Sequence, residues 1–145
     1  MGLGKTLQTI VLLLHLKAQR QLERPMLIVA PLSVLNNWAA ELAKWAPSLS
    51  CCIYHGPNRL LPTNCLKEEP SNRIGLVVDV VLTTYHLLRD DSPTLLAKAH
   101  FTGMVLDEAQ AIKNRISQIT RAVLEVAGHS VGSVRVALSG TPVEN

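Results

Sequence analysis

The stretch Gly103-Met104-Val105-Leu106-Asp107-Glu108 joins a short apolar run directly to two carboxylates. Such a run, without polar alternation, is typical of a strand that is buried on both faces of a parallel sheet. In open α/β sheets, the ligand crevice lies beyond the carboxyl ends of the strands. We therefore expect Asp107 and Glu108 to lie in a ligand-binding crevice. Taken alone, the pair is equally typical of the acidic first turn of a helix, where carboxylates complement the helix dipole.

Other short apolar runs on both sides of this stretch predict further strands of the same sheet. We predict strands over residues 26–30, 50–55, 76–84, 103–106 and 134–138, with Asp79 as an alternative start for the third. Apolar residues at helical spacing predict helices over residues 5–24, 33–47, 85–99 and 116–128, with Ser33 as an N-cap and a break near residues 92–93. Residues 57–72 have no clear period and predict a loop. This alternation predicts an α/β fold with a mostly parallel sheet and helices on both faces.

The composition predicts one folded domain. The chain has 145 residues, 48% of them hydrophobic and 17% charged, which excludes a disordered, solvated polymer. The longest apolar run, residues 10–14, is too short to span a bilayer, and we expect no secretory signal. Cys51, Cys52 and Cys65 lack the spacing of metal ligands, so we expect reduced thiols and no structural metal. A net charge of +3 permits a nucleic-acid partner.

A glycine-rich segment, Met1-Gly2-Leu3-Gly4-Lys5-Thr6, precedes the first predicted helix. Glycines let backbone N–H groups approach phosphates, a helix N-terminus favours anions, and Lys5 adds a mobile positive charge. Thr6 would place its hydroxyl on a magnesium ion that bridges nucleotide phosphates. The segment thus predicts an ATP and Mg²⁺ site. The alternative interpretation is an ordinary glycine-rich segment before a surface helix. The full eight-residue pattern would begin before Met1, so we expect a partial site.

A third segment, Ser139-Gly140-Thr141, follows the last predicted strand. By itself it predicts only a turn. At the tip of a third strand in the same sheet, small hydroxyl residues beside a glycine could approach a phosphate or a carboxylate closely. We therefore interpret it as a relay between the nucleotide and a second partner.

These motifs, in this order, resemble the Swi/Snf-type ATPases of helicase superfamily two. Residues 1–9 resemble motif I, residues 27–35 with Asn37 and Trp38 motif Ia, residues 79–85 motif Ib, residues 106–114 motif II and residues 137–145 motif III. The resemblance covers essentially the whole chain, and Asp-Glu-Ala-Gln followed by Ala-Ile-Lys-Asn is its most specific part. The sequences of residues 79–85 and 140–145 resemble those of bacterial members of the family more than those of eukaryotic members.

The resemblance implies a three-layer RecA-like first lobe that hydrolyses ATP with Mg²⁺ while it grips one strand of double-stranded DNA. It assigns phosphate binding to Gly2, Leu3, Gly4, Lys5 and Thr6, magnesium to Thr6 and Asp107, and catalysis to Lys5, Asp107, Glu108 and Gln110. It assigns DNA contact or coupling to Pro31, Ser33, Thr83, Thr84, Ser139, Gly140 and Thr141. The helix-cap interpretation of Ser33 competes with its contact to DNA.

Departures from the family pattern lead us to expect a partial N-terminal ATP-binding domain over residues 1–145. The adenine-binding segment and the second RecA-like lobe, which completes the active site with arginines, have no counterpart in the chain. We therefore expect little ATPase activity from the chain alone. The alternative functions are a non-catalytic fragment that contacts DNA or a protein and, disfavoured by the acidic pair, a small-molecule kinase. The expected location is the bacterial cytoplasm at the nucleoid, or the nucleus of a eukaryote.

The remaining aromatic residues carry no catalytic pattern in the sequence. We interpret Trp38, Trp45, Tyr54 and the five histidines as packing or surface residues, because nothing pairs a histidine with a nucleophile or a metal set.

Overall fold

The computed structural model describes residues 2–22, 24–62, 77–91, 99–108 and 134–138. For residues 2, 3 and 134–138 it describes the backbone only. The predicted helix over residues 116–128, the predicted site residue Gln110 and the segment Ser139–Thr141 lie outside the described residues.

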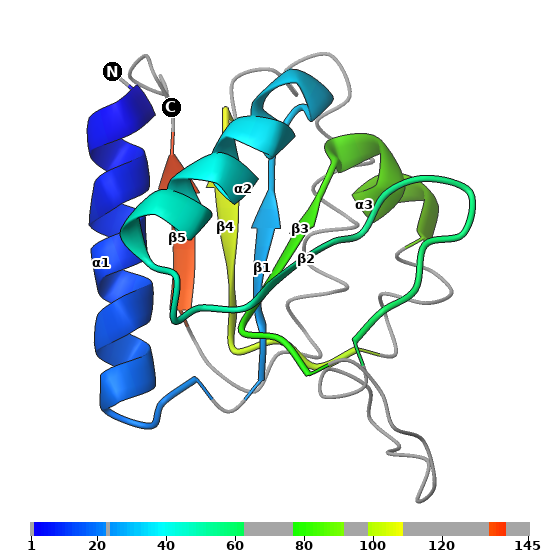
Figure 1. The fold of residues 1–145 in the computed structure, drawn as a ribbon. Helices are drawn as coiled ribbons and strands as arrows, with labels where there is room; N and C mark the ends of the chain where they lie inside the picture. The colour runs from blue at the N-terminus through cyan, green and yellow to red at the C-terminus, as the bar shows by residue number, and fades with distance from the viewer. Residues whose placement is uncertain (1, 23, 63–76, 92–98, 109–133, 139–145) are drawn as a thin grey trace, which may run out of the picture.

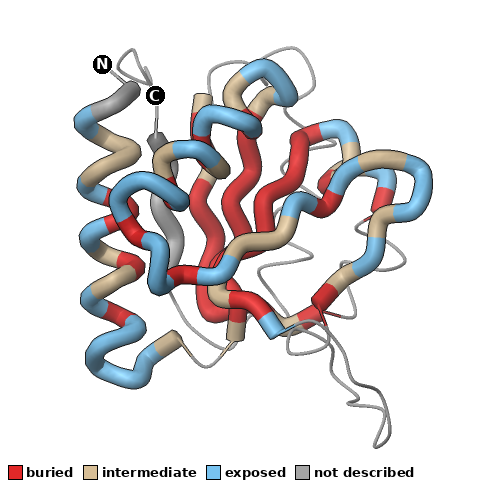
Figure 2. Tube along the Cα trace, viewed as in Figure 1, coloured by how far each residue is buried: buried red, intermediate tan, exposed pale blue. Residues whose placement is uncertain are grey.

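Five parallel strands form the sheet, as the apolar runs predicted (Figure 1). They are β1 (Met26–Val29), β2 (Cys51–Ile53), β3 (Val80–Thr83), β4 (Gly103–Asp107) and β5 (Val134–Leu138), in the order β2-β3-β1-β4-β5. Every residue of β1 and β3 is buried, so the central strands pack on both faces (Figure 2). The predicted strands over residues 50–55 and 76–84 are each shorter in the structure, and Asp79 immediately precedes β3.

Helices cover both faces of this sheet, which confirms the predicted layers (Figure 1). On one face lie α1 (Gly2–Ala18) and α2 (Leu32–Trp45), and on the other lies α3 (Tyr85–Asp91). Two buried clusters separate the layers. The first joins α1 and α2 to the sheet through Ile10, Leu13, Leu35, Leu42, Ile28, Leu82 and Val105. The second joins α3 to the opposite face through Leu88, Leu27, Val29, Val81 and Met104.

The helix α1 ends earlier than the sequence predicted, at Ala18 instead of near Arg24. Arg20 adopts a left-handed backbone with φ of 57°. Its N–H donates to the carbonyl of Lys17 at 3.0 Å, and that of Gln21 donates to the carbonyl of Leu16 at 2.8 Å. This is a Schellman ending, which glycine usually provides. An arginine at this position gave no stop signal in the sequence.

The start of α2 also differs from the prediction, whereas α3 (Tyr85–Asp91) begins at Tyr85 as predicted. Pro31, not Ser33, is the N-cap of α2, and its carbonyl accepts hydrogen bonds from the N–H groups of Val34 and Leu35. The prediction of Ser33 as the cap is therefore wrong, since Ser33 lies inside the helix and is exposed. Thr84 precedes α3, and its Oγ1 accepts a hydrogen bond from the Leu87 N–H at 3.3 Å.

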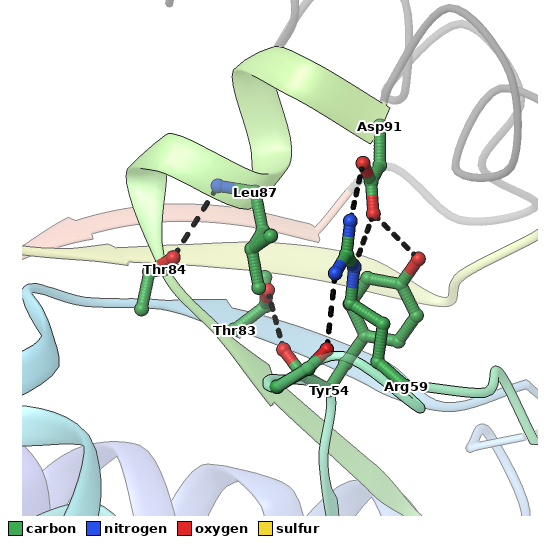
Figure 3. A network of polar contacts seen from close by, with 7 residues as sticks. Tyr54, Arg59, Thr83, Thr84, Leu87 and Asp91 are labelled. Carbon is green, nitrogen blue, oxygen red and sulfur yellow. Dashed lines mark hydrogen bonds and ion pairs between the residues drawn. The ribbon is translucent and has the colours of Figure 1, made fainter.

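A polar network ties the segment after β2 to α3 (Figure 3). Arg59 donates to both carboxylate oxygens of Asp91, from Nε at 2.7 Å and from Nη2 at 3.1 Å. The buried Tyr54 hydroxyl donates to Asp91 Oδ2 at 2.7 Å. Hydrogen bonding from Arg59, assisted by Tyr54, holds the pKa of Asp91 below its ordinary value of 3.8, although burial opposes this shift. Burial, followed by the hydrogen bond to Asp91, raises the pKa of Tyr54 to about 12.

This network predicts an acid-dependent contribution to stability. Because the pKa of Asp91 is lower in the folded protein than in the unfolded chain, its contribution is complete above 3.8 and is lost as the pH falls through the folded value. We expect Arg59→Met to lower the free energy of unfolding at neutral pH. The difference from wild type should shrink as the pH falls below the ordinary carboxyl value, as measured by urea unfolding.

Arg89→Met provides the matched control, because Arg89 donates to the exposed carboxylate of Asp90 at 3.0 Å. Exposed ion pairs contribute little, so its effect should be small at every pH. A difference for Arg59→Met that does not change with pH would contradict this account of Asp91.

Candidate active site

A cleft of about 350 Å³ opens at the carboxyl end of β4. It is lined by Thr6, Val34, Asn37, Trp38, Glu41, Asp107 and Glu108. Residues about 100 positions apart in the sequence thus share one cleft, as the sequence predicted for Thr6 and the acidic pair. Lys5 is not among the lining residues, although it precedes Thr6 in the first turns of α1.

Asp107 is the last residue of β4 and is 9% exposed. The indole Nε1–H of Trp38 donates to its Oδ2 at 2.7 Å. The backbone N–H of Glu108 donates to its Oδ1 at 2.9 Å. The Tyr85 hydroxyl donates to its backbone carbonyl at 2.8 Å. Asp107 is therefore held by groups from α2, from α3 and from its own strand end.

The sequence did not predict that Trp38 and Tyr85 contact Asp107. Trp38 is in the core at 1% exposure, so its interpretation as a packing residue is confirmed but incomplete. A buried indole N–H needs an acceptor, and this general rule was the one available signal. The pKa of Tyr85 is raised above its ordinary value of 10 by burial first, and then by the negative charges of Asp107 and Glu108. Tyr85 therefore remains protonated and keeps its hydrogen bond to the strand end.

Glu108 has a left-handed backbone, with φ of 54°. For a residue other than glycine this conformation costs about 1–3 kcal/mol, and such residues cluster at functional sites. The turn brings the Glu108 N–H to the carboxylate of Asp107, while its half-buried side chain lines the cleft. The strain is thus located where the chain turns sharply beside the two carboxylates.

The glycines of the predicted phosphate loop lie in the first turn of α1, which begins at Gly2. This differs from the loop that the sequence predicted. The first four N–H groups of a helix have no acceptor within it, so they can bind an anion. A Cβ atom added at Gly4 would meet no atom within 4 Å, so the protein itself leaves space there.

Four of the residues predicted to contact DNA or couple to it lie in the described part of the chain. Ser33 is exposed and Pro31 is half-buried at the start of α2. Thr83 is 0% exposed and its hydroxyl donates to the carbonyl of Tyr54 at 3.0 Å. Thr84, at 4% exposure, caps α3 as described above. The hydroxyls of both threonines bond within the fold, and their predicted role in DNA contact or coupling stays a prediction.

The oxygen atoms around the cleft fit a hard cation such as Mg²⁺. They come from the Thr6 hydroxyl and the carboxylates of Asp107 and Glu108. Within the described ranges, no three His, Cys, Asp or Glu side chains gather closely enough to hold a metal ion by themselves. Magnesium is commonly bound by one or two carboxylates together with substrate phosphates and water, which matches this donor set.

The length and hydropathy of the described helices decide whether they could span a membrane. None of those in the described part of the chain is both long and apolar enough to cross a bilayer.

Comparison with known proteins gives consistent results over the whole sequence. The family profile described as "SNF2-related domain" matches residues 1–145. The chain is 39% identical over 145 residues to the SWI/SNF chromatin-remodeling complex subunit snf22 of Schizosaccharomyces pombe, covering 100% of this chain and 8% of that protein. It is 40% identical to the putative ATP-dependent helicase/translocase YwqA of Bacillus subtilis, covering 100% of this chain and 14% of that protein.

Solved structures show the same fold. The Sulfolobus solfataricus SWI2/SNF2 ATPase core in complex with dsDNA superposes with a TM-score of 0.71 at 38% identity, over 98% of this chain and 26% of that one. The core domain from the same organism gives 0.74 at 40% identity, over 99% and 26%. The parallel sheet, the cleft that joins Thr6 to Asp107, and the match over all 145 residues have one explanation: the chain belongs to the SNF2-related domain family.

Proposed function

We propose that the chain is the ATP-binding and ATP-hydrolysing lobe of a DNA-dependent ATPase or translocase. The observation that carries this proposal is the shared cleft of Thr6, Asp107 and Glu108. The chain spans 8–14% of the length of the two curated relatives named above. We therefore propose the activity for a longer protein that contains this lobe.

In this proposal, each residue acts through its position around the cleft. The N-terminus of α1 and Lys5 bind the phosphates of ATP, while Thr6 and Asp107 hold Mg²⁺. When bound, Mg²⁺ neutralises charge on the terminal phosphates and orients them. Glu108 orients or deprotonates the attacking water. The predicted role of Gln110 is to sense the γ-phosphate or to contact the segment over residues 137–145 that resembles motif III.

Double-stranded DNA is the proposed partner, in keeping with the printed description of the Sulfolobus complex. The exposed residue Ser33, beside Pro31 at the start of α2, is the described surface that we assign to it. Ser139, Gly140 and Thr141 are proposed to couple the nucleotide to DNA and to a second RecA-like lobe. A second lobe is also proposed to supply the arginines, so we expect the 145-residue chain alone to hydrolyse ATP slowly. The proposed location is the bacterial cytoplasm or a eukaryotic nucleus.

A non-catalytic module that contacts DNA or a protein is the second candidate. One observation favours it: α1 runs through the glycines, so the described backbone is helical where the family resemblance expects a loop around phosphates. Nucleotide binding and hydrolysis distinguish the two functions.

We expect Lys5→Ala and Glu108→Gln to lower DNA-stimulated ATP hydrolysis by about 100-fold or more in the full-length protein, because each removes stabilisation of the transition state. Both side chains lie outside the buried clusters, so the melting temperature should change little. Phosphate release, measured with and without duplex DNA, checks the result.

The matched controls are Lys44→Ala and Asp90→Asn, which remove the same charges at exposed positions. Both should keep wild-type turnover. Wild-type turnover in Lys5→Ala would refute the proposed role of Lys5. If the wild-type protein itself hydrolyses no ATP, with or without DNA, the non-catalytic module is favoured.

Gly4 gives a test in which stability and binding move in opposite directions. Alanine favours the helical backbone over glycine by up to about 1 kcal/mol, and Gly4, in the first turn of α1, is exposed with space for a Cβ. We expect Gly4→Ala to raise the melting temperature and to weaken binding of a fluorescent ATP analogue, since the methyl group enters the phosphate space.

The control for Gly4→Ala is Gly56→Ala. The φ of Gly56 is 93°, so alanine there should destabilise by more than about 1 kcal/mol and leave nucleotide affinity unchanged. Undiminished binding by Gly4→Ala would count against phosphate binding at the start of α1.

A further inference from the structure

Trp38 contacts the candidate metal ligand from inside the core. It lies in the second turn of α2, and its ring belongs to the buried cluster that includes Leu35, Leu42 and Val105. Its Nε1–H nevertheless ends at the cleft, 2.7 Å from Asp107 Oδ2. A side chain that packs at 1% exposure has little freedom to turn, so the direction of this N–H is fixed by the core.

The two oxygens of Asp107 have separate donors. Oδ2 accepts the indole N–H of Trp38 at 2.7 Å, and Oδ1 accepts the backbone N–H of Glu108 at 2.9 Å. Rotation of the carboxylate about its Cβ–Cγ bond would break both hydrogen bonds. Each carboxylate oxygen has further lone-pair capacity, so neither bond prevents contact with a cation.

Partners that orient a metal ligand usually change metal affinity by 10–100-fold when they are removed. The indole N–H is a donor only and cannot itself bind a cation. Its contact with Asp107 can therefore act on a metal ion only through the carboxylate.

We propose that Trp38 is a positioning residue that orients the Asp107 carboxylate for the divalent cation of a nucleoside triphosphate. The inference rests on the proposed function and deepens it, because it assigns control of the cation requirement to α2. The same helix begins at Leu32, between Pro31 and Ser33 of the surface that we assign to DNA, so α2 joins that surface to the metal ligand through one helix.

The chain offers a matched control on the same helix. Trp45 Nε1 donates to Glu41 Oε2 at 2.7 Å, the same indole–carboxylate bond, but Trp45 is 49% exposed and its partner is not the candidate metal ligand. Trp38→Phe and Trp45→Phe therefore remove the same kind of hydrogen bond from two different carboxylates.

The test is a cation titration of the full-length protein with saturating ATP and DNA. For Trp38→Phe we expect the Mg²⁺ concentration at half-maximal hydrolysis to rise by about 10-fold or more, with the rate restored at high Mg²⁺. Binding of Mn²⁺ to the ADP complex, followed by electron paramagnetic resonance, should weaken by the same factor. Affinity for ADP without metal, and every value for Trp45→Phe, should match wild type.

Asp107→Asn separates failure of this inference from failure of the proposed function. If Trp38→Phe needs the same Mg²⁺ concentration as wild type for half-maximal hydrolysis, while Asp107→Asn still abolishes Mn²⁺ binding, the role of Trp38 alone is overturned. Wild-type Mn²⁺ binding by Asp107→Asn would overturn the proposed site itself.

A spectroscopic measurement keeps the inference testable where Trp38→Phe fails to fold. Protein labelled with fluorotryptophan, with Trp45→Phe used for assignment, reports the Trp38 ring directly. Addition of Mg²⁺ with ADP should shift the Trp38 fluorine resonance more than addition of ADP alone. Equal shifts in the two samples would overturn the inference.

Discussion

The parallel register around β1 is the constraint on which the candidate site depends. β1 lies between β3 and β4, and Val29 is level with Thr83 on one side and with Leu106 on the other. The three strands therefore end together at one edge, where the chain turns into α2, α3 and the acidic pair. A slip of β4 by one residue would exchange its faces and move Asp107 away from Trp38. Correct packing of the apolar strands is thus a condition for the polar contacts.

Those polar contacts in turn hold a strained turn in place. The left-handed backbone of Glu108 costs about 1–3 kcal/mol, and a hydrogen bond to a charged group contributes about 1.5–3 kcal/mol. The two magnitudes are similar, so the bonds from Trp38 and from the Glu108 N–H to the Asp107 carboxylate can offset the strain. Tyr85 adds a bond to the strand end from the opposite layer. The site is consequently rigid on the side of β4, where a metal ligand needs a fixed direction.

The sequence predicted what depends on local pattern and missed what depends on contacts between distant segments. The strand over residues 134–138 was predicted with its observed ends, because an apolar run has clear limits. The end of α1 was missed because Arg20 takes the place of glycine in a left-handed ending. Thr83 was predicted to contact or couple to DNA, and the structure shows it buried, with its hydroxyl bonded to the carbonyl of Tyr54, 29 residues away in the sequence. The bond from Trp38 to Asp107 spans 69 residues, a distance over which periodicity carries no information.

The central claim is that the cleft between α1, α2 and the end of β4 binds the magnesium complex of ATP. A crystal structure of the full-length protein with Mg²⁺, ADP and beryllium fluoride tests it most directly. The account predicts a metal ion between the Thr6 hydroxyl and the Asp107 carboxylate, phosphate oxygens at the N-terminus of α1, and an intact bond from Trp38 to Asp107. A nucleotide bound elsewhere, or a metal ion that contacts neither Thr6 nor Asp107, would contradict the account.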